Sequence, residues 1–126
     1  MNIQDNLKYT KDHEWVLLNG DEALIGITDF AQGELGDIVF IEVETLGEAL
    51  EKEEVFGTIE AVKTVSDLFM PLSGEVIEFN DALEATPELI NTDPYGKGWI
   101  IKVKASNLDE VKDLLSSEEY REMVEG

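Results

Sequence analysis

The chain has 126 residues, a formal net charge of −20 from 29 acidic and 9 basic side chains, and no cysteine. Its length suits one domain that buries about two thirds of its unfolded surface, and its 43% hydrophobic content excludes a disordered acidic tail. Disulfides are excluded, and a chain with one arginine and eight scattered lysines is a poor partner for nucleic acids or anionic membranes.

Short runs rich in Val, Ile and Phe predict that most of the chain forms β-strands. The sequence Asn19-Gly20-Asp21 separates the first two and indicates a hairpin with a type I′ turn. The expected strands cover residues 14–18, 22–28, 37–43, 55–62, 66–70, 74–79 and 98–104. In the last of them apolar residues alternate with lysines, which predicts one buried and one solvated face. This pattern favours a β-sandwich or flattened barrel over a parallel α/β sheet, which would need helices between the strands.

Helices are expected only at the edges of this β-structure. Thr28 is placed to cap a short helix that ends near Leu35, and Thr86 precedes a proline suited to the first turn of another helix. The polar stretch 80–97 is otherwise expected to be a functional or weakly ordered loop.

Two further helices are predicted at the C-terminal end, over about residues 107–125. An apolar stripe follows the possible cap Asn107, and Ser116 with Glu119 forms a capping box for the second helix. We expect these helices to cover the sheet.

The residues of common catalytic and metal sites are missing. One histidine, His13, and no cysteine cannot supply a zinc site, and the spacing of a calcium-binding loop is absent. The sequence also lacks a nucleophile elbow, a phosphate-cradling loop and a dinucleotide fingerprint. We therefore expect no metal site and no catalytic residue.

Lys63 stands out because it lies near the tip of an expected hairpin, between residues 55–62 and 66–70. A lysine amine on a rigid turn is accessible, and it is nucleophilic when deprotonated, so it suits covalent attachment of a carried group. On spacing and composition alone, an ordinary solvent-facing lysine is the simpler interpretation.

Four segments, in order along almost the whole chain, resemble the glycine cleavage H-protein family. Residues 57–80, GTIEAVKTVSDLFMPLSGEVIEFN, are similar to its lipoyl-lysine segment. Residues 8–16, 26–42 and 91–102 are similar to its N-terminal motif, its next block and its late strand. The resemblance implies a single lipoyl-carrier domain over residues 1–126, mainly β. The implied fold is a hybrid barrel-sandwich of the lipoyl/biotinyl kind, with two antiparallel sheets, short edge helices and a C-terminal helical cap.

For the site, the resemblance implies that Lys63 carries lipoate in amide linkage, on a hairpin region of about residues 55–79. It also implies that Glu60 helps the attaching enzyme, a lipoate ligase or a lipoyl or octanoyl transferase, to recognise the hairpin. Gly57 and Gly74 flank the hairpin at family positions, where glycine allows the backbone to bend or pack closely. The lipoyl dithiolane would supply the thiol and disulfide chemistry that this cysteine-free chain lacks.

The resemblance further places Glu14 and Asp67 beside a cleft that receives the loaded arm. We expect these carboxylates to hold the cationic aminomethyl group by charge-assisted hydrogen bonds and to keep it protonated. The alternative is that both are ordinary exposed acids. His13 is expected to be a structural neighbour of the cleft and not a catalyst.

The implied function is that of a non-catalytic, monomeric carrier that serves three enzymes. A pyridoxal-phosphate glycine decarboxylase loads the arm and releases carbon dioxide, and an aminomethyltransferase passes the one-carbon unit to tetrahydrofolate. Dihydrolipoamide dehydrogenase then reoxidises the dithiol with FAD and NAD. The acidic surface either steers partners with basic surfaces toward the chain or only keeps the chain soluble.

Other uses of the same fold stay open at this point. A lipoyl relay that donates lipoate to other 2-oxoacid dehydrogenase subunits needs the same lysine. A biotinyl carrier is disfavoured because Val62 and Thr64, and not methionines, flank Lys63. A catalytic β-domain that uses Glu14 and Asp67 unaided is the remaining alternative.

The N-terminal residues 1–5 show neither a basic leader nor an apolar signal segment. The expected location is therefore the bacterial cytoplasm, or a mitochondrion if the chain is a mature organellar protein. Three departures from the family pattern are Asp12, the bulky pair Phe69-Met70 and the absence of proline in residues 42–47. We expect them to alter partner fit or arm docking and not the fold.

Overall fold

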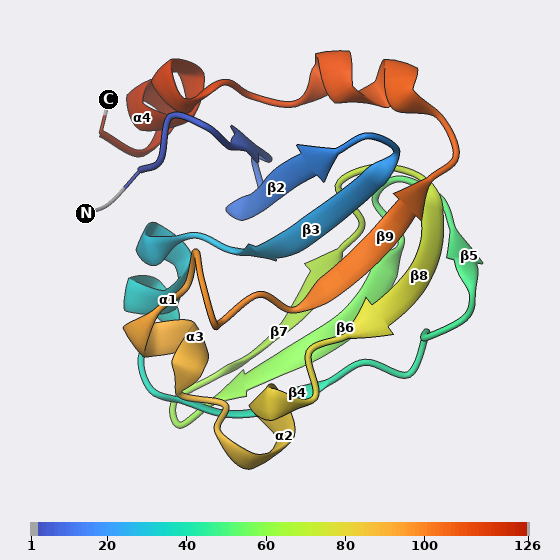
Figure 1. Ribbon diagram of the computed structural model, residues 1–126. Coiled ribbons are helices and arrows are strands. Elements are labelled where there is room, and N and C mark those ends of the chain that lie inside the picture. The colour runs from blue at the N-terminus through green and yellow to red at the C-terminus, as the bar shows by residue number, and fades with distance from the viewer. Residues whose placement is uncertain (1–2, 126) are drawn as a thin grey trace.

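The computed structural model describes residues 3–125; Met1, Asn2 and Gly126 lie outside the described residues, so the expectation for the N-terminal residues 1–5 falls partly outside them. Two antiparallel β-sheets pack against each other, with helices at the ends (Figure 1). The strands are β1 (Lys8–Tyr9), β2 (Glu14–Asn19), β3 (Glu22–Ile27), β4 (Ile38–Glu42), β5 (Ala49–Leu50), β6 (Val55–Ala61), β7 (Val65–Phe69), β8 (Gly74–Phe79) and β9 (Ile101–Ala105). The helices are α1 (Asp29–Leu35), α2 (Ala82–Ala85), α3 (Leu89–Thr92), the 3₁₀ helix η1 (Leu108–Asp113) and α4 (Ser117–Glu125).

The large sheet has the strand order β1-β2-β3-β9-β8-β5, and the small sheet has the order β4-β6-β7. Apolar side chains from both sheets, among them Ile25, Ile59 and Val103, form one buried core between them. The predicted mainly-β fold of two antiparallel sheets is confirmed. The two-residue strands β1 and β5 were not predicted, because such short strands carry no alternating pattern.

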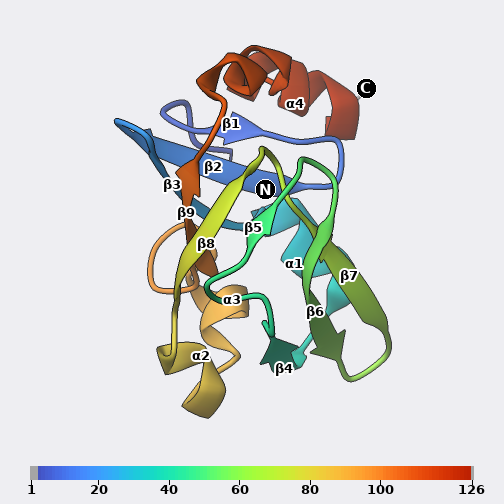
Figure 2. The same cartoon turned by 90° about the vertical axis from the view of Figure 1, so that its right-hand side faces the viewer.

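The segment 55–79 divides between the sheets. β6 and β7 form a hairpin in the small sheet, and Glu60 opposite Val65 is its last cross-strand pair before the turn. The turn is closed by the Ala61 amide, which donates to the Thr64 carbonyl at 2.7 Å. β8 instead pairs with β5 and β9 in the large sheet. The hairpin therefore projects from the molecule as the free end of the small sheet (Figure 2).

The turn between β2 and β3 differs from the prediction. Asn19 pairs with Glu22, so Gly20 and Asp21 are the central residues of the turn. A positive φ of 66° occurs at Gly20 and not at Asp21. A type I′ turn needs positive φ at both central positions, whereas a type II′ turn needs it only at the first. The expected type I′ turn is therefore wrong, and the turn is of the II′ kind.

The stretch 80–97, predicted as a loop, contains the short helices α2 and α3. Leu83 of α2 and Ile90 of α3 are buried in the core, so both helices are fixed to the sheets. Thr86 is not a helix cap, because α3 begins three residues later, at Leu89, without a side-chain cap. The polar composition of this stretch does not predict these helices, because each of them buries only one residue.

Other predicted caps are confirmed. The Thr28 hydroxyl accepts from the Ala31 amide at 3.2 Å at the start of α1. The Ser116 amide donates to the Glu119 carboxylate at 2.9 Å, and the Glu119 amide donates to the Ser116 hydroxyl at 3.2 Å, as a capping box requires.

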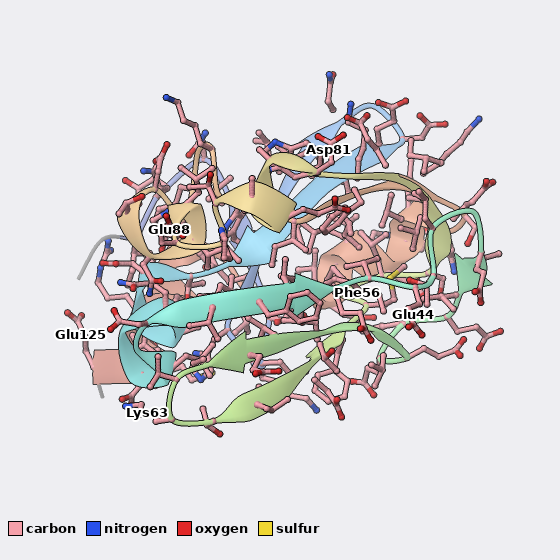
Figure 3. The ribbon with its side chains drawn as sticks, turned by 90° about the horizontal axis from the view of Figure 1, so that it is seen from below. Glu44, Phe56, Lys63, Asp81, Glu88 and Glu125 are labelled. Atoms are coloured by element: carbon pink, nitrogen blue, oxygen red, sulfur yellow. The ribbon has the colours of Figure 1, made fainter. Side chains whose placement is uncertain are left out.

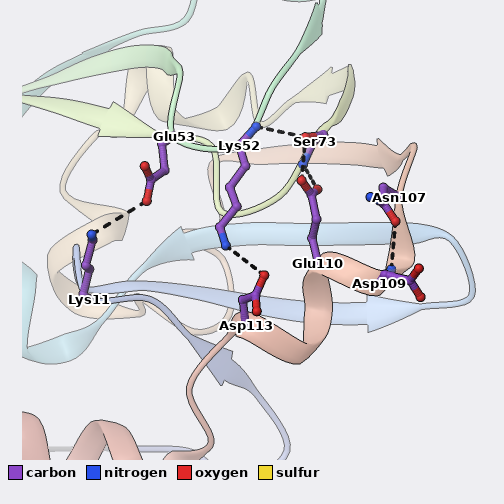
Figure 4. Close-up of polar contacts among 8 residues, drawn as sticks. All are labelled: Lys11, Lys52, Glu53, Ser73, Asn107, Asp109, Glu110 and Asp113. Atoms are coloured by element: carbon purple, nitrogen blue, oxygen red, sulfur yellow. Dashed lines mark hydrogen bonds and ion pairs between the residues drawn. The ribbon is translucent and has the colours of Figure 1, made fainter.

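The C-terminal elements cover one side of the large sheet, and α4 lies over β1 and β2 (Figure 2). The first of them is a 3₁₀ helix and not an α-helix. Glu110 of η1 accepts hydrogen bonds from the amide and the hydroxyl of Ser73, at 2.7 and 3.0 Å, and Lys52 forms an ion pair with Asp113 (Figure 4). These contacts fasten η1 to the segments that enter and leave the hairpin.

Candidate functional site

Lys63 lies at the end of the β6–β7 hairpin, and its side chain is exposed (Figure 3). Its stem passes close to Gly36: a Cβ added to that glycine would lie 3.4 Å from Lys63 Cε. Gly36 is the C-cap of α1. The hairpin thus presents an accessible amine at the end of α1, on a turn held by the two strands.

Gly57 and Gly74 sit at close backbone approaches that no side chain fits. A Cβ on Gly57 would lie 2.5 Å from the carbonyl oxygen of Glu42, at a bulge in the pairing of β6 with β7. A Cβ on Gly74 would collide with the carbonyl oxygen of Lys104 and with Val103. Both glycines therefore serve packing at the base of the hairpin region and lie apart from the lysine.

A cleft of about 260 Å³ lies beside the hairpin, between β7, α1 and the residues that begin β2. Its apolar wall comes from both sheets and α1: Ile27, Phe30, Leu35, Ile59 and Leu68. Its acidic members are Asp12, Glu14, Glu34 and Asp67, and His13 completes this side. An apolar trough with an acidic rim suits an aliphatic chain that ends in a cationic group.

Glu14 and Asp67 therefore line the same cleft, but their environments differ. Asp67 is exposed, whereas Glu14 is only 2% exposed. The Phe69 amide donates to Glu14 Oε2 at 2.8 Å, and the Thr10 hydroxyl lies 3.3 Å from Oε1. Burial outweighs these hydrogen bonds and raises the pKa of Glu14 to about 8. Glu14 is thus a protonated acid at neutral pH, and of the two only Asp67 is an exposed acid.

His13 is held in an unusual backbone conformation, with φ of 65°. Its amide donates to the Thr10 carbonyl and its carbonyl accepts from the Thr28 amide, which fixes this conformation. His13 Nδ1 lies 2.9 Å from the Tyr120 hydroxyl, which lies 2.7 Å from Thr28 Oγ1. Burial lowers the pKa of His13, so the imidazole is neutral at neutral pH. The ring is therefore positioned at the cleft by a hydrogen-bond chain that begins in α4.

Glu14 also lines a second hollow, of about 200 Å³. Thr10 and Asp12 contribute to this hollow, and so do Lys11 and Glu53, whose ion pair is drawn in Figure 4. Asp12 faces both hollows. From the sequence, Asp12 is identified only as a departure from the family pattern, and Glu34 and Phe30, which α1 brings to the cleft, are not predicted as site residues. The helical spacing of Phe30 and Glu34 was the available signal.

Among the described residues, no group of His, Cys, Asp and Glu could hold a metal ion, and no helix is long and apolar enough to cross a membrane. Two packed antiparallel sheets, a hairpin that presents one lysine, and an adjoining cleft define a carrier domain of the lipoyl/biotinyl class.

Comparisons with known proteins identify the family. The family model described as "Glycine cleavage H-protein" matches residues 7–126. The chain is 57% identical to the glycine cleavage system H protein of Bacteroides thetaiotaomicron, with full coverage of both chains. It is 56% identical to that of Chlorobium phaeobacteroides, with 98% of each covered. The crystal structure of a glycine cleavage system H protein from Mycobacterium marinum superposes with a TM-score of 0.89 at 38% identity, over 98% of this chain and 100% of that one.

The chain belongs to the glycine cleavage H-protein family. The resemblance noted in the sequence is confirmed, and with it the carrier role in glycine cleavage.

Proposed function

We propose that this chain carries lipoate on Lys63 and shuttles the aminomethyl group of glycine. Its partners are a pyridoxal-phosphate glycine decarboxylase, a tetrahydrofolate-dependent aminomethyltransferase and dihydrolipoamide dehydrogenase. The observation that carries the proposal is the exposed Lys63 at the end of α1, beside a cleft with an apolar wall and an acidic rim. When bound, the lipoyl group supplies the dithiolane that accepts and releases the carried group.

The residues of the cleft fit such a group. Ile27, Phe30 and Leu35 offer a dry wall for methylene groups, which gains free energy as their apolar surface leaves water. Asp67 offers an exposed carboxylate at the rim. A cation that enters the cleft is thus bound at its charged end and along its aliphatic stem.

Glu14 adds a proton-dependent contact. With a pKa of about 8, it holds its proton while the cleft is empty. A cation beside its carboxyl group lowers the pKa, because an opposite charge favours the ionised form. Glu14 then loses its proton and accepts a charge-assisted hydrogen bond on Oε1, while the Phe69 amide continues to donate to Oε2. The cost of a buried carboxylate is therefore incurred only when the cation is present.

His13 limits the access of water to this side of the cleft. Its ring stacks obliquely with Phe30, with centroids 4.8 Å apart, and Tyr120 holds Nδ1. The neutral imidazole adds no positive charge that would repel the carried cation. We assign His13 to positioning and not to catalysis.

Loading by glycine and a pyridoxal-phosphate glycine decarboxylase tests the function directly. Lipoylated wild-type chain is expected to gain the aminomethyl group, and Lys63→Arg is expected to gain nothing. This result also separates glycine cleavage from a lipoyl relay, which needs no loading by glycine. A lipoylated wild-type chain that stays unloaded while a known H protein is loaded contradicts the proposal.

The lifetime of the loaded chain tests the cleft. Glu14→Gln and Asp67→Asn are each expected to shorten it, because a carboxylate that holds the cation protonated is lost. Glu48→Gln, which removes an exposed acid outside the cleft, serves as the matched control. Equal lifetimes in all three variants and the wild type would rule out the protective role of Glu14 and Asp67.

A further inference from the structure

The outer face of the small sheet carries an exposed apolar strip next to Lys63. Phe40 of β4 lies opposite Glu60 of β6, and Glu60 lies opposite Val65 of β7, so these side chains form one row across the sheet. Phe40 is 50% exposed and Val65 is 63% exposed. The inner face of the same strands packs into the core through Ile41, Ile59 and Leu68.

A bulge in β4 enlarges this strip. The register of β4 with β6 shifts between Ile38 and Phe40, and both Val39 and Phe40 then lie exposed. Regular alternation would direct one of two neighbouring residues toward the core. Val62, beside Lys63 in the turn, is 74% exposed. We call Val39, Phe40, Val62 and Val65 the hairpin ridge.

The surroundings of the hairpin ridge are acidic. The strands of the small sheet contain Glu42, Glu60 and Asp67 and no lysine or arginine. Within the described part of the chain, none of these carboxylates forms an ion pair. Lys63 is the cation of this hairpin, and acylation removes its charge. A partner that fits this surface has an apolar recess bordered by lysine or arginine side chains.

We propose that the hairpin ridge is the docking surface for the enzyme that acylates Lys63. That enzyme must bring its activated acyl group to Lys63 Nζ itself, within one side-chain length of the turn between β6 and β7, so its surface must lie against the hairpin, where Val62 and Val65 are exposed. Enzymes that act at the far end of a completed arm can stand away from it. This inference rests on the proposed function, because it requires that Lys63 is the attachment site.

The covalent step needs ATP and lipoate as co-reactants. The ligase first joins lipoate to AMP and releases pyrophosphate. The neutral Lys63 Nζ then attacks the acyl carbon, the N–C amide bond forms, the bond to AMP breaks, and Nζ loses a proton. Phe40 takes no part in this chemistry and lies outside the hairpin sequence. A decrease in the rate of lipoylation after its replacement therefore indicates weaker docking of the ligase.

The test measures kcat/KM for lipoylation of the unmodified full-length chain by a bacterial lipoate–protein ligase with ATP. Phe40→Ser is expected to lower kcat/KM about tenfold, mainly through KM, as expected for an anchor residue worth about 1.4 kcal/mol. Leu108→Ser replaces an apolar residue of similar exposure, 49%, on η1, and is expected to stay within about twofold of the wild type. Unfolding curves of both variants establish that they are folded.

Glu42→Lys gives a second reading that does not depend on the apolar anchor. Glu42→Lys is expected to lower kcat/KM at low salt. The difference in kcat/KM between this variant and the wild type is expected to shrink as the salt concentration is raised, because salt screens exposed charges. Wild-type rates for both Phe40→Ser and Glu42→Lys would overturn the inference.

Two other outcomes are distinguishable. A Phe40→Ser chain that is lipoylated normally but loaded poorly by glycine decarboxylase would assign the ridge to that enzyme and overturn the inference. A wild-type chain that the ligase does not modify at Lys63 would instead refute the proposed function.

Discussion

The buried carboxyl group of Glu14 makes the stability of this protein depend on pH in a defined way. Its pKa in the folded chain is about 8, against an ordinary value of 4.5, because burial disfavours the charged form. Below pH 4.5 the group is protonated in both the folded and the unfolded chain, and its contribution to stability is fully present. As the pH rises toward 8, the unfolded chain releases the proton and the folded chain retains it, so this contribution is lost. Above pH 8 both states are ionised and the loss is complete.

Glu14→Gln isolates this effect, because an amide has the shape of the protonated acid and does not titrate. Its oxygen can accept from the Phe69 amide, and its NH₂ group can donate to the Thr10 hydroxyl. At 1.36 kcal/mol per pKa unit, the raised pKa of Glu14 lowers the free energy of unfolding of the wild type, relative to its value below pH 4.5, by about 1 kcal/mol at pH 5 and about 3 kcal/mol at pH 7. The free energy of unfolding of Glu14→Gln relative to the wild type should therefore rise by about 2 kcal/mol between these pH values.

Urea unfolding of both chains at pH 5, 6, 7 and 8 measures this difference. Glu48→Gln, an exposed substitution, records the general effect of removing one negative charge from the chain. If the difference between Glu14→Gln and the wild type were the same at every pH, Glu14 would not be a buried protonated acid, and its proposed response to a cation would fail with it.

Four further substitutions test the packing and the site. Tyr120→Phe keeps the ring stack with Tyr9 and removes the hydrogen bonds of the hydroxyl. It should lower the free energy of unfolding by about 1 to 3 kcal/mol, and a chemical denaturation midpoint equal to the wild type's would contradict this. Gly74→Ala should cost about 1 to 3 kcal/mol from overpacking. Gly33→Ala in α1, where an added Cβ meets nothing within 4 Å, should be neutral or stabilising by up to about 1 kcal/mol; equal losses in the two alanine variants would refute the packing argument. Lys63→Arg should abolish lipoylation, measured by intact mass, with an unchanged melting temperature; a large drop in that temperature would reveal a structural role.

Much of the fold follows from local signals in the sequence. The apolar runs place the longer strands, and Thr28 and Ser116 mark helix starts that the structure confirms. The alternation in β9 is also confirmed, since Ile101 and Val103 are buried while Lys104 is exposed. These features depend on a few neighbouring residues, which is why sequence alone identifies them.

The features that the sequence did not predict depend on residues far apart in the chain. Leu83 and Ile90 anchor helices in a polar stretch only because the two sheets offer a core for them. Glu14 lies at the start of a strand, and its buried carboxyl group accepts a hydrogen bond from the amide of Phe69, which is 55 residues away. The neutral state of this acid therefore could not be inferred from the motif that contains it.

Peptide mapping by mass spectrometry of protein isolated from its own host shows whether Lys63 carries lipoate. We expect one lipoyl group in amide linkage on the peptide that contains Lys63, and none on the other lysine peptides. An unmodified Lys63, or a biotinyl group in place of the lipoyl group, would contradict the proposed function.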